Sequence, residues 1–150
     1  METYNLYRDG KKVASGLTEK SITDTGLTAN KEYSYQISAE NEVGESPLSE
    51  PLLVRTKYSA VSSVTLNKTT LALETGANNT LTVTVSPSTA DLSVTWTSSD
   101  PSIATVDTNG KVVAVKAGSA TITVTSKADN TKKATCAVTV TDPTPPPEGE

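Results

Sequence analysis

The chain has 150 residues, of which 35% are hydrophobic and 20% are charged, and its formal net charge at pH 7 is −4. Because it contains no His, it can have no Ser-His-Asp or Cys-His nucleophile pair and no His-ligated metal site. The single cysteine, Cys136, can form neither an internal disulfide nor a thiolate cluster, so we expect no metal and no cofactor. Neither half of the chain has an excess of basic residues, which argues against a nucleic-acid partner.

Thr is the commonest residue and aromatic residues make up only 4% of the chain, a composition that favours strands. We therefore expect an all-β protein. No apolar run approaches the roughly 20 residues of a membrane-spanning helix, so we expect no membrane insertion.

Residues 1–57 predict short strands separated by turns. The first two strands are joined by Asp9-Gly10, which suits a type I′ hairpin turn because both central positions of that turn require positive φ. A short strand is expected around residues 21–23. In the next strand the apolar face carries Tyr33, Tyr35, Ile37 and Ala39. The last strand runs through Leu52, Val54 and Thr56.

This first stretch resembles part of a fibronectin type III domain. The residues that carry the resemblance are Tyr4-x-Leu6-Tyr7-x-Asp9-Gly10, Leu27 followed six residues later by Tyr33, and Ala39-x-Asn41-x-x-Gly44-x-Ser46. The resemblance implies a tyrosine corner, in which the Tyr33 hydroxyl bonds to upstream backbone.

The resemblance starts at the third strand of that fold, so it implies a partial sandwich that lacks its first two strands. The inner face formed by Leu6, Tyr35 and Ile37 would then have only a short strand to cover it. Either the chain begins inside the domain, which we favour, or another chain supplies the missing strands. We expect such an uncovered sheet to promote association.

Residues 61–141 follow a short linker at residues 58–60 and form a second predicted domain. Six or seven short strands with alternating apolar and polar residues predict a β-sandwich. Trp96 and Cys136 share the parity of the apolar positions, so we expect core roles rather than a sugar-stacking ring and a reactive thiol. The inward positions are Leu81, Val83, Val85, Val94, Trp96, Ala120, Ile122, Val124, Cys136, Val138 and Val140.

The second domain closely resembles the bacterial immunoglobulin-like group 2 domain. The matching residues include Val64-Thr65-Leu66, Leu71-x-Leu73-x-x-Gly76, Leu81-Thr82-Val83-x-Val85-x-Pro87, Val94-Thr95-Trp96-Thr97, Ala104-Thr105-Val106-Asp107 and Ala117-Gly118-x-Ala120-Thr121-Ile122. The resemblance implies a complete Ig-like antiparallel β-sandwich. It also implies an accessory module of the kind found in bacterial adhesins, secreted polysaccharide-active enzymes and tailed-phage proteins.

The sequence offers no catalytic, cofactor-binding or metal-binding residues. The stretch Asp107–Lys111 starts like a calcium loop, but its glycine directly follows the second ligand position, so a hairpin turn through Asn109-Gly110 explains it better. Tyr7 and Tyr58 are the only aromatic candidates for contact with a ligand. The Pro-rich tail, residues 142–150, has no core-forming residue and is predicted to be disordered.

The resemblance, together with the lack of candidate catalytic residues, implies a non-catalytic module of a larger phage virion or bacterial surface protein, displayed on the virion or cell surface. Such a module would attach weakly, through many copies, to bacterial cell-wall or surface polysaccharide, and it would contact other domains or subunits of the parent protein. Two alternatives remain open. In the first, the module is a passive spacer that positions other domains. In the second, it is an accessory domain of a secreted polysaccharide-active enzyme.

Overall fold

The computed structural model describes residues 1–143, and these form strands and connecting loops without a helix, as the sequence predicts. Accordingly, no helix in this part of the chain is long and apolar enough to cross a membrane. The chain divides into two compact units, unit 1 (Met1–Tyr58) and unit 2 (Ser59–Glu150). The predicted disordered tail lies, from residue 144 onward, outside the described residues.

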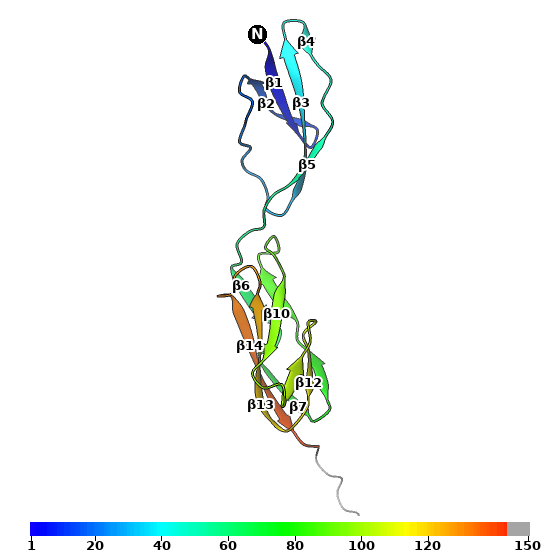
Figure 1. Cartoon of the computed structure of the whole chain (residues 1–150), viewed down its shortest axis with the longest axis vertical. Helices are drawn as coiled ribbons and strands as arrows, with labels where there is room; N and C mark the ends of the chain where they lie inside the picture. The colour runs from blue at the N-terminus through cyan, green and yellow to red at the C-terminus, as the bar shows by residue number, and fades with distance from the viewer. Residues whose placement is uncertain (144–150) are drawn as a thin grey trace, which may run out of the picture. The chain divides into compact units, whose positions relative to one another are not determined.

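Unit 1 is a single antiparallel sheet (Figure 1). Its strand order is β2-β1-β3-β4, and β5 also pairs with β3. The two central strands are in register so that Leu6 faces Ile37 and Asn5 faces Ser38. The strands are β1 (Thr3–Arg8), β2 (Lys11–Leu17), β3 (Glu32–Asn41), β4 (Gly44–Glu45) and β5 (Leu52–Arg55).

The predicted hairpin turn between β1 and β2 is confirmed. Asp9 has φ 50° and Gly10 has φ 76°, so both central residues adopt the positive φ that a type I′ turn needs. The Asp9 carboxylate also accepts a hydrogen bond from the Ser34 backbone N–H at 3.0 Å, which ties the turn to β3.

The prediction of a strand around residues 21–23 is wrong, because these residues lie in a loop that connects β2 to β3. A strand needs a neighbouring strand for its backbone hydrogen bonds, and this loop lies over the face of the sheet rather than along an edge. Side chains hold it there instead. The Asp24 carboxylate accepts bonds from Arg8 at 2.8 Å and from the Tyr35 hydroxyl at 2.7 Å.

The bond expected at the tyrosine corner is present. The backbone N–H of Thr28 donates to the hydroxyl oxygen of Tyr33 at 2.9 Å, and Tyr33 is one of the two buried apolar side chains among the residues described in unit 1. The ring thereby fixes the end of the loop against β3.

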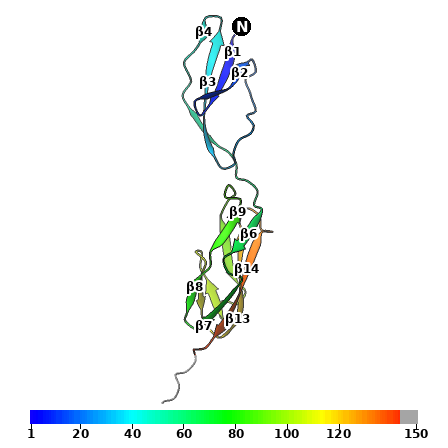
Figure 2. The same ribbon diagram turned by 180° about the vertical axis from the view of Figure 1, so that it is seen from behind.

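Unit 2 is built from three sheets, with orders β10-β13-β14-β7, β11-β12-β8 and β6-β9 (Figures 1 and 2). The predicted Ig-like antiparallel β-sandwich is confirmed: pairing between these strands is antiparallel except between β14 and β7, which are parallel. The strands are β6 (Ser63–Leu66), β7 (Thr70–Glu74), β8 (Asn78–Thr80), β9 (Val83–Ser86), β10 (Val94–Ser98), β11 (Ala104–Val106), β12 (Lys111–Ala114), β13 (Gly118–Ser126) and β14 (Lys133–Thr141).

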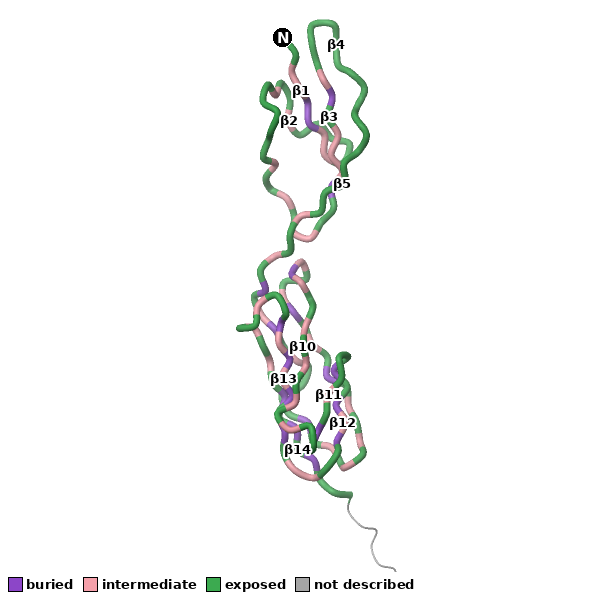
Figure 3. Tube along the Cα trace, viewed as in Figure 1, coloured by how far each residue is buried: buried purple, intermediate pink, exposed green. Residues whose placement is uncertain are grey.

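The core of unit 2 has two adjoining parts. The larger contains Ile122, Val112 and Cys136, all fully buried, and the smaller forms around Val64, Val85 and Val124. Buried positions follow the strands of unit 2, whereas unit 1 is mostly half-buried or exposed (Figure 3). Burial of alternate apolar side chains between two layers is what stabilises a sandwich, so the packing confirms this architecture for unit 2.

Candidate functional site

One face of the unit 1 sheet carries a polar cluster centred on Glu45. The carboxylate oxygen Oε1 accepts hydrogen bonds from Asn5 Nδ2 at 2.9 Å, from the Tyr7 hydroxyl at 2.6 Å and from the Ser38 hydroxyl. The other oxygen, Oε2, accepts from Lys12 Nζ at 2.9 Å. Asn5 and Ser38 are almost completely buried, so these bonds satisfy polar groups that water does not reach.

The same contacts lower the pKa of the Glu45 carboxyl to about 2. The hydrogen bond from Ser38 is the largest cause, followed by those from Tyr7, Lys12 and Asn5. Each of these donors stabilises the ionised carboxylate, and the Lys12 ammonium adds an opposite charge. Tyr7, a predicted ligand contact, is therefore already engaged in this cluster. Its role in binding a ligand stays a prediction.

We expect the stability that Glu45 gives unit 1 to depend on pH. The folded pKa lies below the ordinary value of 4.5, so this stability is fully present above pH 4.5 and is lost as the pH falls toward about 2. All five tyrosines lie in unit 1, so near-ultraviolet circular dichroism of tyrosine follows its unfolding. In urea unfolding, the free energy of unfolding of unit 1 should be higher for the wild type than for Glu45→Gln at pH 7. The two values should converge as the pH falls through this range. If the difference in free energy of unfolding between the two proteins stays constant from pH 7 to pH 2, the ionised Glu45 carboxylate is not the source of this stability.

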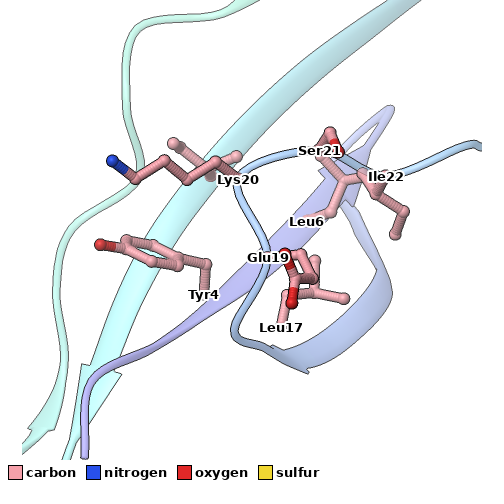
Figure 4. Close-up of a pocket in the computed structure, with 8 residues that line it drawn as sticks. Tyr4, Leu6, Leu17, Glu19, Lys20, Ser21 and Ile22 are labelled. Carbon is pink, nitrogen blue, oxygen red and sulfur yellow. The ribbon is translucent and has the colours of Figure 1, made fainter.

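The opposite face of the unit 1 sheet is apolar and has a hollow of about 310 Å³ (Figure 4). Ile37 is 49% exposed there although it lies on the central strand β3. The loop after β2 covers part of this face, and no strand of the described residues covers it. The face is thus more open than the sequence predicted, because the short strand expected over it is absent. Its lining residues are Tyr4, Leu6, Leu17, Glu19, Lys20, Ser21, Ile22 and Ile37.

Tyr58, the other predicted ligand contact, is the last residue of unit 1 and is 56% exposed. It does not line the hollow on the apolar face, and it does not belong to the polar cluster around Glu45. The structure therefore does not combine the two tyrosines into one site, and Tyr58 stays a prediction.

Unit 2 presents a face rich in hydroxyl groups on its four-stranded sheet, here called the hydroxyl face. Thr97 on β10, Thr123 on β13 and Thr135 on β14 are directly opposite one another in register, on strands about 4.8 Å apart. Alternation along a strand predicts which Thr side chains point outward, but only the register shows that they align across three strands. The hydroxyl face consists of Thr95, Thr97, Thr121, Thr123, Thr125, Thr135 and Thr139.

The predicted core role of Cys136 is confirmed, and that of Trp96 is confirmed for only part of its side chain. Cys136 is fully buried, and burial raises the pKa of its thiol, so it behaves as a small apolar side chain. Trp96 is half-buried: it packs against both parts of the core, and it also lines a groove on the surface of unit 2.

The stretch that starts like a calcium loop is a hairpin turn between β11 and β12, as predicted. The Asp107 carboxylate oxygen Oδ1 accepts the backbone N–H groups of Asn109 at 2.8 Å and Lys111 at 2.9 Å, which occupies it within the turn. Within residues 1–143 no group of three or more Cys, Asp and Glu side chains is placed to hold a metal ion.

Comparisons with known proteins agree with the geometry of unit 2. A sequence model of the bacterial Ig-like domain (group 2) matches residues 60–138. The chain is 39% identical over 133 residues to the Ig-like virion protein of Serratia phage KSP90, a match that covers 87% of this chain and 48% of that protein. It is 34% identical over 134 residues to the lacto-N-biosidase of Bifidobacterium bifidum, covering 87% of this chain and 11% of that protein.

Among solved structures, the S-layer protein rSbsC(31-844) superposes with a TM-score of 0.53 at 19% identity, over 95% of this chain and 20% of that one. This likeness concerns the fold alone. The chain spans less than half the length of the two curated relatives described above. The family match lies in unit 2, so the assignment of residues 1–57 to a partial fibronectin type III domain stays a prediction. On the match over residues 60–138, the chain belongs to the bacterial Ig-like domain (group 2) family.

Proposed function

We propose that this chain is a non-catalytic module of a larger surface protein, most simply a phage virion protein, and that it attaches weakly to bacterial surface polysaccharide. The observation that carries the proposal is the hydroxyl face of unit 2. Its threonines can donate and accept hydrogen bonds, as sugar hydroxyls do, and their alignment across three strands matches an extended polymer. The Ig-like virion protein among the relatives supports a setting on a phage particle.

Attachment through such a face depends on copy number. A flat face exchanges hydrogen bonds with water for hydrogen bonds with sugar, so each contact gains only about 1 kcal/mol. One copy would bind with a Kd of about 1 mM or weaker. An array of copies raises the overall affinity by roughly 10²–10⁴-fold, because each binding event after the first is intramolecular.

The test compares the labelled full chain as a monomer and as an array on beads. Both are incubated with intact Gram-positive cells, intact Gram-negative cells and purified cell-wall polysaccharide. We expect retention of the array and not of the monomer on at least one of these surfaces. An array that none of the surfaces retains would refute the proposal.

A matched pair of variants assigns retention to the hydroxyl face. Thr97→Val, Thr123→Val and Thr135→Val together remove aligned hydroxyls while keeping β-branched side chains of similar size. The control, Thr65→Val with Thr84→Val, removes exposed hydroxyls from the paired strands β6 and β9. Retention should fall at least tenfold in the first variant only; an equal fall in both would show that this face is not the contact surface.

The second candidate is a passive spacer that positions other domains, including a catalytic domain in an enzyme. The small share of the lacto-N-biosidase that this chain covers favours it. Replacing unit 2 in a parent protein by an unrelated sandwich of equal length would leave the parent's activity intact if the spacer function is correct.

A further inference from the structure

The outer edge of β10 borders a groove of about 410 Å³ in unit 2. This volume lies within the roughly 300–1,000 Å³ typical of small-molecule sites. Trp96 and Val106 give the groove apolar surface, and polar groups come from Thr95, Asp107 and Lys127. A mixture of apolar surface with a few polar groups is what binds a sugar ring, which has apolar C–H faces and a rim of hydroxyls.

The groove is held in shape before any ligand arrives. The Asp107 carboxylate is fixed by the backbone N–H groups of Asn109 and Lys111. The backbone N–H of Lys127 donates to the Ser93 carbonyl at 2.9 Å, which joins the chain after β13 to the start of β10. The Asp107 side chain therefore loses little conformational entropy on binding.

The groove is also continuous with the hydroxyl face. Thr95 belongs to both, because it lines the groove and lies opposite Thr125 on the outward side of the sheet. Within residues 1–143, β10 is the edge strand of its sheet and pairs only with β13, while its last residue, Ser98, donates a side-chain hydrogen bond to the Ala104 carbonyl of β11 at 2.6 Å. The groove therefore lies where the four-stranded sheet ends. A polymer crossing the hydroxyl face would therefore meet the groove at the edge of the sheet.

We infer that this groove holds one hexopyranose unit of the polysaccharide, an inference that rests on the proposed function. The C–H face of the ring contacts Trp96 and Val106. Sugar hydroxyls donate to Asp107 and accept from Lys127. Asp107 and Lys127 have opposite charges, so the groove carries no net charge, which suits a neutral sugar better than an anionic one.

The test uses Trp96 as its reporter, since it is the only tryptophan in the chain. Maltotriose, cellotriose, mannotriose and N,N′,N″-triacetylchitotriose are each titrated into the full chain while the tryptophan emission is recorded. At least one of them should shift the emission saturably. Asp107→Asn keeps the acceptor oxygen that the turn needs, and Lys127→Ala removes an exposed ammonium; each should weaken that apparent affinity by about tenfold.

Lys116→Ala is the control, because Lys116 is exposed and lies outside the groove lining. Unchanged emission with every trisaccharide, or equal weakening by Lys127→Ala and Lys116→Ala, would overturn the inference. If the bead array is retained but the tryptophan emission is unchanged, sugar binding in the groove is refuted, whereas attachment through the hydroxyl face is still supported. A variant-sensitive emission shift without bead retention would support the groove and refute multivalent attachment.

Discussion

Replacing Gly110 with alanine is expected to lower the free energy of unfolding of unit 2 by about 3 kcal/mol. Gly110 has φ +81°, a conformation that L side chains rarely adopt. An added Cβ would also lie 2.4 Å from the Leu81 carbonyl oxygen and 2.9 Å from Trp96 Cζ2. The backbone cannot easily move away, because the Leu81 N–H donates to the Gly110 carbonyl at 2.9 Å.

Gly76→Ala separates the two parts of this cost. Gly76 has φ +85°, but a Cβ there would meet none of the described atoms within 4 Å. Only the backbone strain remains, so the expected loss is about 1 kcal/mol. Urea unfolding followed by Trp96 emission measures both variants in unit 2. Equal losses for Gly110→Ala and Gly76→Ala would show that the close approach at Gly110 contributes nothing.

The second large effect is expected for Ile122→Ala, at about 3 kcal/mol. Ile122 is completely buried on the central strand β13, where it lies opposite Cys136 and packs in the larger part of the core. Truncation removes apolar contacts and leaves a cavity that strands on both sides of β13 prevent from collapsing.

The matched control is Thr121→Ala on the same strand. Thr121 points outward and is exposed, so its loss should cost about 1 kcal/mol or less, mainly through strand propensity. Trp96 emission during urea unfolding again provides the measurement. If the two substitutions cost the same, the packing around Ile122 does not stabilise unit 2.

Local chemistry made several features predictable from the sequence. Asp9-Gly10 specified its turn because few other residues accept positive φ at both positions. Alternation placed Ile122 and Cys136 in the core because successive strand residues point to opposite faces. Both results depend only on neighbours in the chain.

Features that depend on pairing between distant strands were not predictable in this way. The residues around 21–23 have the composition of a strand, but no strand within residues 1–143 pairs with them. The polar cluster around Glu45 forms because β1, β2, β3 and β4 bring its members together from four strands. The alignment of Thr97 with Thr123 and Thr135 requires the register, which the outward pattern of each strand leaves open.

The parallel pairing of β7 with β14 has a mechanical consequence. The pair runs from Thr70 opposite Ala137 to Glu74 opposite Thr141. A pull transmitted through the start of β7 and the end of β14 draws the two strands in opposite directions along their length. Their hydrogen bonds cross between the strands, so the load acts on the bonds together rather than opening them one after another. Shear of this kind gives the module resistance to tension between its two ends.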